Sequence, residues 1–250
     1  GSEMCIRDRS HMGRVWIKGD EATGFFDYVT PNKVSALAVG QGHYSVLCND
    51  AGGIKDDIVI VRLEDKAYLM VFNAGNRQKN LSWLNEHSKD HKVDLNNVSD
   101  TVSMFAVQGP RAQETLQEIS NEDFSHVPRF GGISLELDGV KGVATRTGYT
   151  GEDGFEVFAL DTSVSKPQNA VKVWNAIIEH GKRFKIEPCG LGARDVLRLE
   201  AGMCLYGHDI TESTTPFQAR IGWVVKLEKE RFIGKEALAR EKVTGPEMIR

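Results

Sequence analysis

Two adjacent aspartates in the segment GGIKDDIVI could supply a carboxylate for proton transfer. Asp56 and Asp57 follow a glycine-containing turn, where a loop becomes a strand-like apolar run. Because successive side chains of a strand point to opposite faces, at most one aspartate faces a given cavity, and the other meets solvent or caps the turn. Two interpretations of Asp57 stay open, a functional carboxylate or a solvated turn residue.

The stretch RTGYTGEDGFEVF, residues 146–158, carries a second candidate carboxylate, Glu156. Its glycines permit tight turns and close backbone approach, which is typical of a shaped surface. In the strand GFEVF, Glu156 shares a face with Phe158, whereas Phe155 and Val157 share the other face. A carboxylate beside an aromatic ring fits a flat heterocycle with two parallel N–H donors, as on a pterin edge. The alternative is an internal salt bridge.

Two further polar side chains occur at positions that suit ligand binding. Arg194, in GLGARDVLRLEAGM, lies one helical turn from Arg198 and could reach an anionic ligand or pair with Glu156. Helical arginines are also commonly solvated or paired with nearby acids. Asn73 opens NAGN after an apolar run, where it either caps a helix or donates its amide to a ligand. Capping is the commoner role of such a residue.

Composition and motifs exclude several classes of function. The net charge of -4 and the lack of a basic run argue against nucleic acid as the main partner. No window approaches the roughly 18 apolar residues of a membrane helix. The sequence has no GxSxG, P-loop, HExxH or GxGxxG motif. The seven histidines and four cysteines lack metal-like spacing, so we expect no metal site and reduced thiols in a cytoplasmic protein.

The first half of the chain has the periodicity of an α+β domain. Phe25 and Phe26 belong to one amphipathic helix, which ends at Pro31, and Leu81 and Leu84 belong to another. The strand-like runs around them are 12–18, 44–48, 58–63, 68–72 and 102–107. This order predicts a split βαβ, ferredoxin-like antiparallel sheet with one added strand and its helices on one face.

The second half predicts another α+β domain and shows no internal repeat. Helices are expected after Pro110, after Pro167 and at 191–203, and strand-like runs lie at 133–137, 143–147 and 222–227. We therefore expect four regions: a non-native leader at 1–9, a ferredoxin-like domain at 10–109, a second α+β domain at 110–225, and the start of a truncated C-terminal domain at 226–250.

Three long motifs in fixed order, NDAGGIKDDIVIVRL, RTGYTGEDGFEVF and CGLGARDVLRLEAGMCLYGHDI, resemble the T proteins of the glycine cleavage system, the aminomethyltransferases. The resemblance runs from Ser10 to the end of the chain. It implies a three-domain cloverleaf with tetrahydrofolate in a central cavity, here lacking most of the C-terminal β-barrel. The family transfers an aminomethyl group from the lipoyl arm of H protein to tetrahydrofolate, giving methylenetetrahydrofolate and ammonia without a metal. Its members act in the cytoplasm, or in the mitochondrial matrix of eukaryotes.

The resemblance also assigns roles to residues. The family's catalytic aspartate falls on Asp57, its pterin-binding glutamate on Glu156 and its folate-contacting arginine on Arg194. Asn73 and Tyr149 lie in matching motifs and are expected to contact folate.

Two related functions remain open at this point. One is a folate-dependent demethylase, or the folate domain of a dimethylglycine or sarcosine oxidising enzyme, although the chain has no flavin-binding fingerprint. The other is a non-catalytic folate-binding assembly factor. That branch carries a KGC-type motif, where this chain has IGKEA.

Overall fold

The computed structural model describes residues 4–246, which divide into two compact units. Unit 1 contains residues 4–12 and 98–203, and unit 2 contains residues 13–97 and 204–246. Across residues 4–246, no helix combines the length and the apolar character needed to cross a membrane.

Unit 2 contains a five-stranded antiparallel sheet in the order β3-β4-β5-β2-β6. Its strands are β2 (Gly13–Lys18), β3 (Gly42–Cys48), β4 (Ile54–Glu64), β5 (Ala67–Phe72) and β6 (Asp94–Asn97). Its helices are α1 (Ala22–Val29), η1 (Val34–Ala36), η2 (Ala74–Asn76), α2 (Arg77–His87), η5 (Gly222–Val224) and α6 (Lys235–Thr244). Strands β6, β2, β5 and β4 have the ferredoxin-like order, and β3 is the added strand. The predicted fold class is therefore confirmed.

One face of this sheet is covered by α1 and α2. Phe25, Phe26 and Val29 of α1 are fully buried against the sheet, and Leu84 of α2 joins the same core. Helix α1 ends where the Thr30 N–H donates to the Phe26 carbonyl at 3.0 Å. Pro31 follows and cannot continue the helix. Each buried phenylalanine contributes about 2 kcal/mol from apolar burial alone.

The opposite face of β3 and β4 is covered by the segment 204–246. Val224, Phe232 and Leu238 pack there on Val46 and Cys48. The predicted strand at 222–227 is wrong, because its amides bond locally: in η5 the Val224 N–H donates to the Ile221 carbonyl at 3.0 Å. The segment therefore completes unit 2 by packing its apolar side chains on the sheet.

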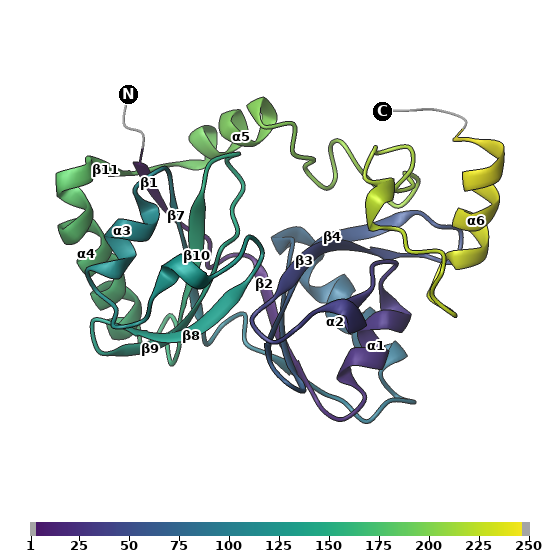
Figure 1. The fold of residues 1–250 in the computed structure, drawn as a ribbon, viewed down its shortest axis with the longest axis horizontal. Helices are drawn as coiled ribbons and strands as arrows, with labels where there is room; N and C mark the ends of the chain where they lie inside the picture. Colours follow the sequence, from purple (N-terminus) through teal and green to yellow (C-terminus); the bar gives the residue numbers. More distant parts are fainter. Residues whose placement is uncertain (1–3, 247–250) are drawn as a thin grey trace. The chain divides into compact units, whose positions relative to one another are not determined.

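Unit 1 contains a six-stranded mixed sheet in the order β11-β1-β7-β10-β9-β8 (Figure 1). Its strands are β1 (Met4–Asp8), β7 (Ser103–Gln108), β8 (Gly132–Leu137), β9 (Val140–Thr145), β10 (Gly154–Ala159) and β11 (Ile186–Pro188). Its helices are α3 (Ala112–Gln117), η3 (Phe124–His126), α4 (Gln168–Gly181), η4 (Lys182–Phe184) and α5 (Leu191–Glu200). Only the β1–β11 pair is parallel among the strand pairs described.

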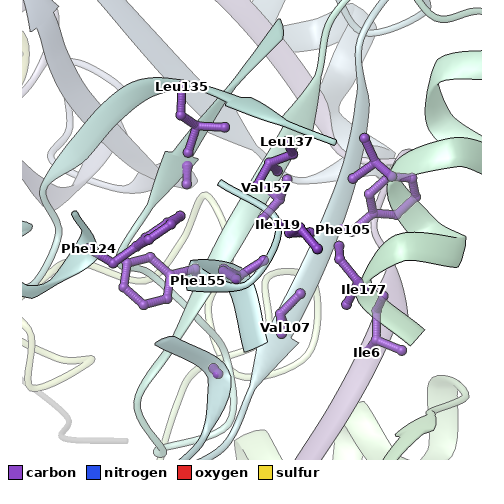
Figure 2. Packing of buried hydrophobic residues seen from close by; sticks show 14 of the residues in the cluster. Ile6, Phe105, Val107, Ile119, Phe124, Leu135, Leu137, Phe155, Val157 and Ile177 are labelled. Atoms are coloured by element: carbon purple, nitrogen blue, oxygen red, sulfur yellow. The ribbon is translucent and has the colours of Figure 1, made fainter. Parts of the chain in front are cut away.

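The core of unit 1 lies between this sheet and the helices α3 and α4. Figure 2 shows Phe105 and Val107 of β7 beside Phe155 and Val157 of β10, with Ile177 of α4 facing them. These side chains are buried, and the two central strands are apolar along nearly their whole length. This burial on both faces is typical of strands in the middle of a sheet.

The structure corrects two of the expected boundaries. Residues 4–8, expected to lie in a leader outside the fold, form β1, and its Met4 and Ile6 belong to the core of unit 1. The run 102–107, expected to close the ferredoxin-like sheet, is β7 of the other sheet. Strand β6 closes unit 2 instead. It is polar, as edge strands commonly are, and among the described strands it pairs with β2 alone. The units thus interrupt one another in the sequence, unlike the expected 10–109 and 110–225 domains. Residues 226–246, expected to begin a separate C-terminal domain, belong to unit 2 instead. Residues 1–3 of the expected leader and residues 247–250 lie outside the described residues.

The two units also share one topology, although the sequence shows no repeat. In each unit a strand, a helix, a three-stranded meander, a helix and a closing strand follow one another, and unit 1 inserts β1 beside its closing strand. Arg62 of β4 donates to the Leu37 carbonyl at 2.8 Å, and Arg146 after β9 donates to the Val127 carbonyl at 3.1 Å. Each guanidinium also lies over an aromatic ring, at 5.8 and 5.3 Å. The repeat is therefore carried by turns and backbone contacts more than by residue identities.

Candidate functional site

The two adjacent aspartates of β4 face opposite sides of the sheet, as predicted. Asp56 shares its face with Ile58 and Ile60, which belong to the core under α1 and α2. Asp57 faces the other side and is half-buried. The aspartate that faces away from Asp57 was expected to meet solvent or cap the turn. That expectation is wrong, because Asp56 is 0% exposed and its oxygens bond to asparagines of η2, α2 and the residue before them.

Asp56 is surrounded by asparagine donors. Its Oδ1 accepts hydrogen bonds from Nδ2 of Asn73 at 2.8 Å and Nδ2 of Asn76 at 2.7 Å. Its Oδ2 accepts from the backbone N–H of Asn73 at 3.1 Å and Nδ2 of Asn80 at 2.5 Å. Burial raises the pKa of Asp56, and these hydrogen bonds oppose the rise.

Asn73 does not cap the following helix through its side chain, so the commoner role proposed for it is wrong. Its amide instead donates to Asp56 and, at 2.6 Å, to Oδ1 of Asp57. The predicted site residues Asp57 and Asn73 are thus in direct contact within unit 2.

The Asp57 carboxyl has a pKa suited to proton transfer. Burial, together with the negative charge of Asp56, raises its pKa to about 7, while hydrogen bonds from Asn73 and Tyr44 oppose the rise. The Tyr44 hydroxyl donates to Oδ2 of Asp57 at 3.3 Å. A group that titrates near neutral pH can both accept and return a proton under ordinary conditions. Tyr44 was not predicted as a site residue. The one sequence feature that could have indicated it is its place in β3, the strand that pairs with β4.

An aromatic ring pair lies next to Asp57. The rings of Tyr44 and Trp223 lie 5.8 Å apart at 36°, and the Trp223 side chain is 56% exposed. Lys79 of α2 extends the polar network by donating to Lys55 O at 2.7 Å and to Oε1 of Glu212 at 3.0 Å. These contacts attach the 204–246 segment to β4 beside the aspartates.

In unit 1, Glu156 lies on β10 with the predicted orientation. Phe155 and Val157 face the core, and Glu156 lies on the other face, where it is only 4% exposed. The Thr147 hydroxyl donates to Oε2 of Glu156 at 2.6 Å, and Oε1 forms an ion pair with Arg9. The internal salt bridge considered as an alternative for Glu156 is therefore formed here with Arg9.

The glycine-rich loop before β10 is held by Gln108. Nε2 of Gln108 donates to the carbonyls of Thr147 at 3.1 Å and Phe155 at 3.2 Å. A Cβ at Gly148 would lie 1.8 Å from Oε1 of Gln108, so a larger residue there would displace the Gln108 amide. Gly151 has φ +81°, a conformation that favours glycine. These contacts explain why the loop has so many glycines.

Tyr149 and Arg194 meet beside this loop. The Arg194 guanidinium of α5 lies over the Tyr149 ring at 4.1 Å, a cation–π contact. Both line a pocket of unit 1 together with Arg7, Arg9, Gln108 and Thr150. Burial and the charges of Arg9 and Arg194 lower the pKa of His11. The pocket is thus rich in positive charge and suits an anionic or electron-rich ligand.

The structure therefore brings the predicted site residues together in two groups. Asp57 and Asn73 form one group in unit 2, and Tyr149 and Arg194, with Glu156 on the neighbouring strand, form another in unit 1. That all five residues line one cavity stays a prediction.

Comparisons with known proteins agree on one family. A family model described as the GCVT N-terminal domain matches residues 2–229, a range that includes β1. An aminomethyltransferase of Thermotoga sp. strain RQ2 is 45% identical over 238 residues, which cover 94% of this chain and 64% of that protein. An aminomethyltransferase of Alkaliphilus oremlandii is 42% identical over 241 residues, 96% of this chain and 64% of that protein.

Solved structures give the same result for the fold. The glycine cleavage system aminomethyltransferase T from Bartonella henselae matches with a TM-score of 0.87 and 33% identity, over 98% of this chain and 64% of that one. A heterotetrameric sarcosine oxidase from Corynebacterium sp. U-96 matches with a TM-score of 0.55 at 15% identity, which is a likeness of fold alone. The chain spans 64% of the length of these curated aminomethyltransferases.

Proposed function

Given that the chain belongs to the glycine cleavage T-protein family, we propose that it transfers an aminomethyl group to tetrahydrofolate from the lipoyl arm of an H protein. In this reaction the methylene carbon breaks its bonds to sulfur and to nitrogen and forms bonds to N5 and N10 of the folate. The two protons that leave N5 and N10 end on the dihydrolipoyl thiol and on ammonia. The observation that carries the proposal is the Asp57 carboxyl, which Asn73 holds in place and whose pKa is about 7.

Asp57 is the group suited to the proton transfer at N5. In its ionised form it accepts the N5 proton, and its negative charge offsets the positive charge that develops at the methylene carbon as its leaving groups depart. Asn73 and Tyr44 each bond one oxygen of this carboxylate, at 2.6 and 3.3 Å, and so limit its rotation. A fixed carboxylate loses little orientational freedom in the transition state.

Glu156 is the group suited to hold the pterin ring. A carboxylate pairs with the two parallel N–H donors of the pterin edge, and Thr147 already fixes its Oε2. In the folate complex the pterin takes the place of Arg9 as the partner of Oε1. Arg194 and Tyr149 offer a cation and an aromatic face to the rest of the folate.

Ammonia release tests this proposal directly. The protein is mixed with tetrahydrofolate and H protein whose lipoyl arm carries the aminomethyl group, and H protein without the lipoyl group is the control. We expect ammonia only when both substrates are present. Background release, together with no measurable binding of tetrahydrofolate, is the result that overturns the proposal. Folate binding without ammonia release would instead fit a non-catalytic folate-binding protein.

A further inference from the structure

We propose that Asp56 is a positioning residue, whose buried carboxylate fixes the Asn73 amide so that this amide in turn fixes the Asp57 carboxylate. The inference rests on the proposed function, in which Asp57 is the reacting group.

The Asn73 amide nitrogen lies between two carboxylates. Nδ2 is 2.8 Å from Oδ1 of Asp56 and 2.6 Å from Oδ1 of Asp57. An amide NH2 group has two N–H donors, so it can serve one carboxylate with each. The terminal torsion of asparagine is otherwise broad. The bond to Asp56 therefore selects the amide orientation that presents the second N–H to Asp57.

Asp56 is itself held by four hydrogen bonds and is fully buried. A carboxylate has about four acceptor positions, and N–H donors from Asn73, Asn76 and Asn80 fill four. All four contacts are N–H donors, and none of them could accept a hydrogen bond from a protonated Asp56 carboxyl. The arrangement therefore suits the ionised carboxylate. The donors come from η2 and α2 and from the residue before them, and Asp56 thus connects β4 to both helices.

The charge of Asp56 also acts on Asp57. Two carboxylates on neighbouring residues in a poorly solvated site disfavour one another's ionisation, and Asp57, with fewer donors, takes up the proton. Burial first and Asp56 second raise the pKa of Asp57 to about 7. On β3, Tyr44 donates to Asp57. The other titratable groups of this region are Lys55, Lys79, Tyr206 and Glu212.

Substitution of Asp56 by Asn removes the charge while keeping the shape, and Asp94→Asn, at an exposed position of β6, is the matched control. The readout is the titration of the Asp57 carboxyl carbon, followed by NMR in protein with labelled aspartate and assigned with Asp57→Asn. We expect the Asp57 midpoint to fall by at least about one pH unit in Asp56→Asn and to stay constant in Asp94→Asn. A constant midpoint in both variants overturns the proposal.

Kinetics supply the second readout of the same variants. We expect kcat to fall about tenfold or more in Asp56→Asn, with the tetrahydrofolate Kd within about twofold of the parent. Equal losses in kcat and folate affinity would mean that Asp56 only supports the fold, and would overturn the positioning role. If the parent protein releases no ammonia, the proposed function fails, but the Asp57 titration still decides the role of Asp56.

A milder variant covers the case in which Asp56→Asn does not fold. Asn76 is half-buried, and Asn76→Ala removes one donor from Oδ1 of Asp56 without changing its charge. We expect the Asn73 side-chain NH2 protons to exchange with solvent severalfold faster, and kcat to fall severalfold at constant folate Kd. If exchange and kcat both match the parent, Asp56 does not act through Asn73, and the proposal is overturned.

Discussion

At the residue scale, Asp57 is the side chain whose removal should separate chemistry from binding. Asparagine has nearly the same shape and keeps an oxygen for the Asn73 donor, but it cannot accept the N5 proton. We expect Asp57→Asn to lower kcat by about a hundredfold or more, because general base catalysis contributes on that order. Tetrahydrofolate affinity, measured by calorimetry, should change by less than about threefold. Parallel losses of turnover and affinity would identify Asp57 as a structural aspartate.

The raised pKa of Asp57 also predicts how stability depends on pH. The folded protein keeps a proton on Asp57 up to about pH 7, whereas the unfolded chain releases it near the ordinary value of 3.8. Between these values the folded state binds more protons, so this group's contribution to the free energy of unfolding falls as pH rises and is lost above about 7. Asp57→Asn removes that loss.

Urea denaturation of the parent and of Asp57→Asn at pH 4 and pH 8 measures this effect. From pH 4 to pH 8, we expect the free energy of unfolding of the variant to rise relative to that of the parent by on the order of 1 kcal/mol. This figure is reduced because Asp57 is only half-buried. The same difference at both pH values would show that the folded and unfolded pKa values of Asp57 are similar.

Glu156→Gln tests the pterin contact in unit 1. Glutamine presents one N–H group where the pterin edge also presents N–H groups, so one hydrogen bond of the pair is lost and a donor faces a donor. We expect the tetrahydrofolate Kd to rise about tenfold or more, with a smaller effect on kcat at saturating folate. Glu152→Gln, at an exposed position of the preceding loop, is the control and should leave the Kd unchanged. An unchanged Kd in Glu156→Gln would leave Glu156 a structural role alone, through Arg9 and Thr147.

Residue identities alone could not separate the roles of Asp56 and Asp57. The period of the strand correctly places them on opposite faces, but which face is buried depends on Asn76 and Asn80, some twenty residues further along the chain. The role of Asn73 was mispredicted for the same reason, since its amide bonds to β4 instead of to its own helix. Local patterns predict orientation, whereas these partners come from tertiary packing.

At the element scale, the loop 147–151 lies between β9 and β10 of unit 1 and carries Tyr149, which is proposed to contact folate. Gly148→Ala would drive a methyl group into Gln108, whose amide holds this loop through Thr147 and Phe155. We expect a loss of about 1 to 3 kcal/mol in stability, measured by urea denaturation, and weaker folate binding, because Tyr149 shifts with the loop.

Gly24→Ala is a suitable counterpart to Gly148→Ala. Gly24 lies inside α1, and nothing lies within 4 Å of a Cβ added there. Alanine should stabilise this helix by about 0.5 to 1 kcal/mol. A neutral effect of Gly148→Ala on both stability and folate binding would mean that Gln108 adjusts freely, and that the loop does not depend on this close approach.

Elements with strong periodicity were predicted well, and weak or edge elements were not. The helix through Phe25 and Phe26 and the strands near Asp57 lie where the apolar spacing predicts them. Strand β6 has the polar sequence DLNN and offers no period-2 signal, so the apolar run of β7 was assigned in its place. Val224 and Val225 were predicted to lie in a strand because both are apolar and β-branched. Their side chains are buried, but the backbone of Gly222–Val224 forms the 3-10 helix η5.

At the scale of the whole molecule, the proposed chemistry draws on both units. Asp57 belongs to unit 2, and Glu156 and Arg194 belong to unit 1, so the reacting group and the groups proposed to bind folate belong to different compact units. The chain passes between the units after residues 12, 97 and 203. Such crossings could not be predicted from composition, because no proline-rich or glycine-rich linker marks them.

A crystal structure of the protein with tetrahydrofolate tests the central claim most directly. The account predicts one bound folate whose pterin N–H edge lies within hydrogen-bond distance of the Glu156 carboxylate and whose N5 faces the Asp57 carboxylate. A folate bound without contact to Glu156, or with N5 turned away from Asp57, would contradict it.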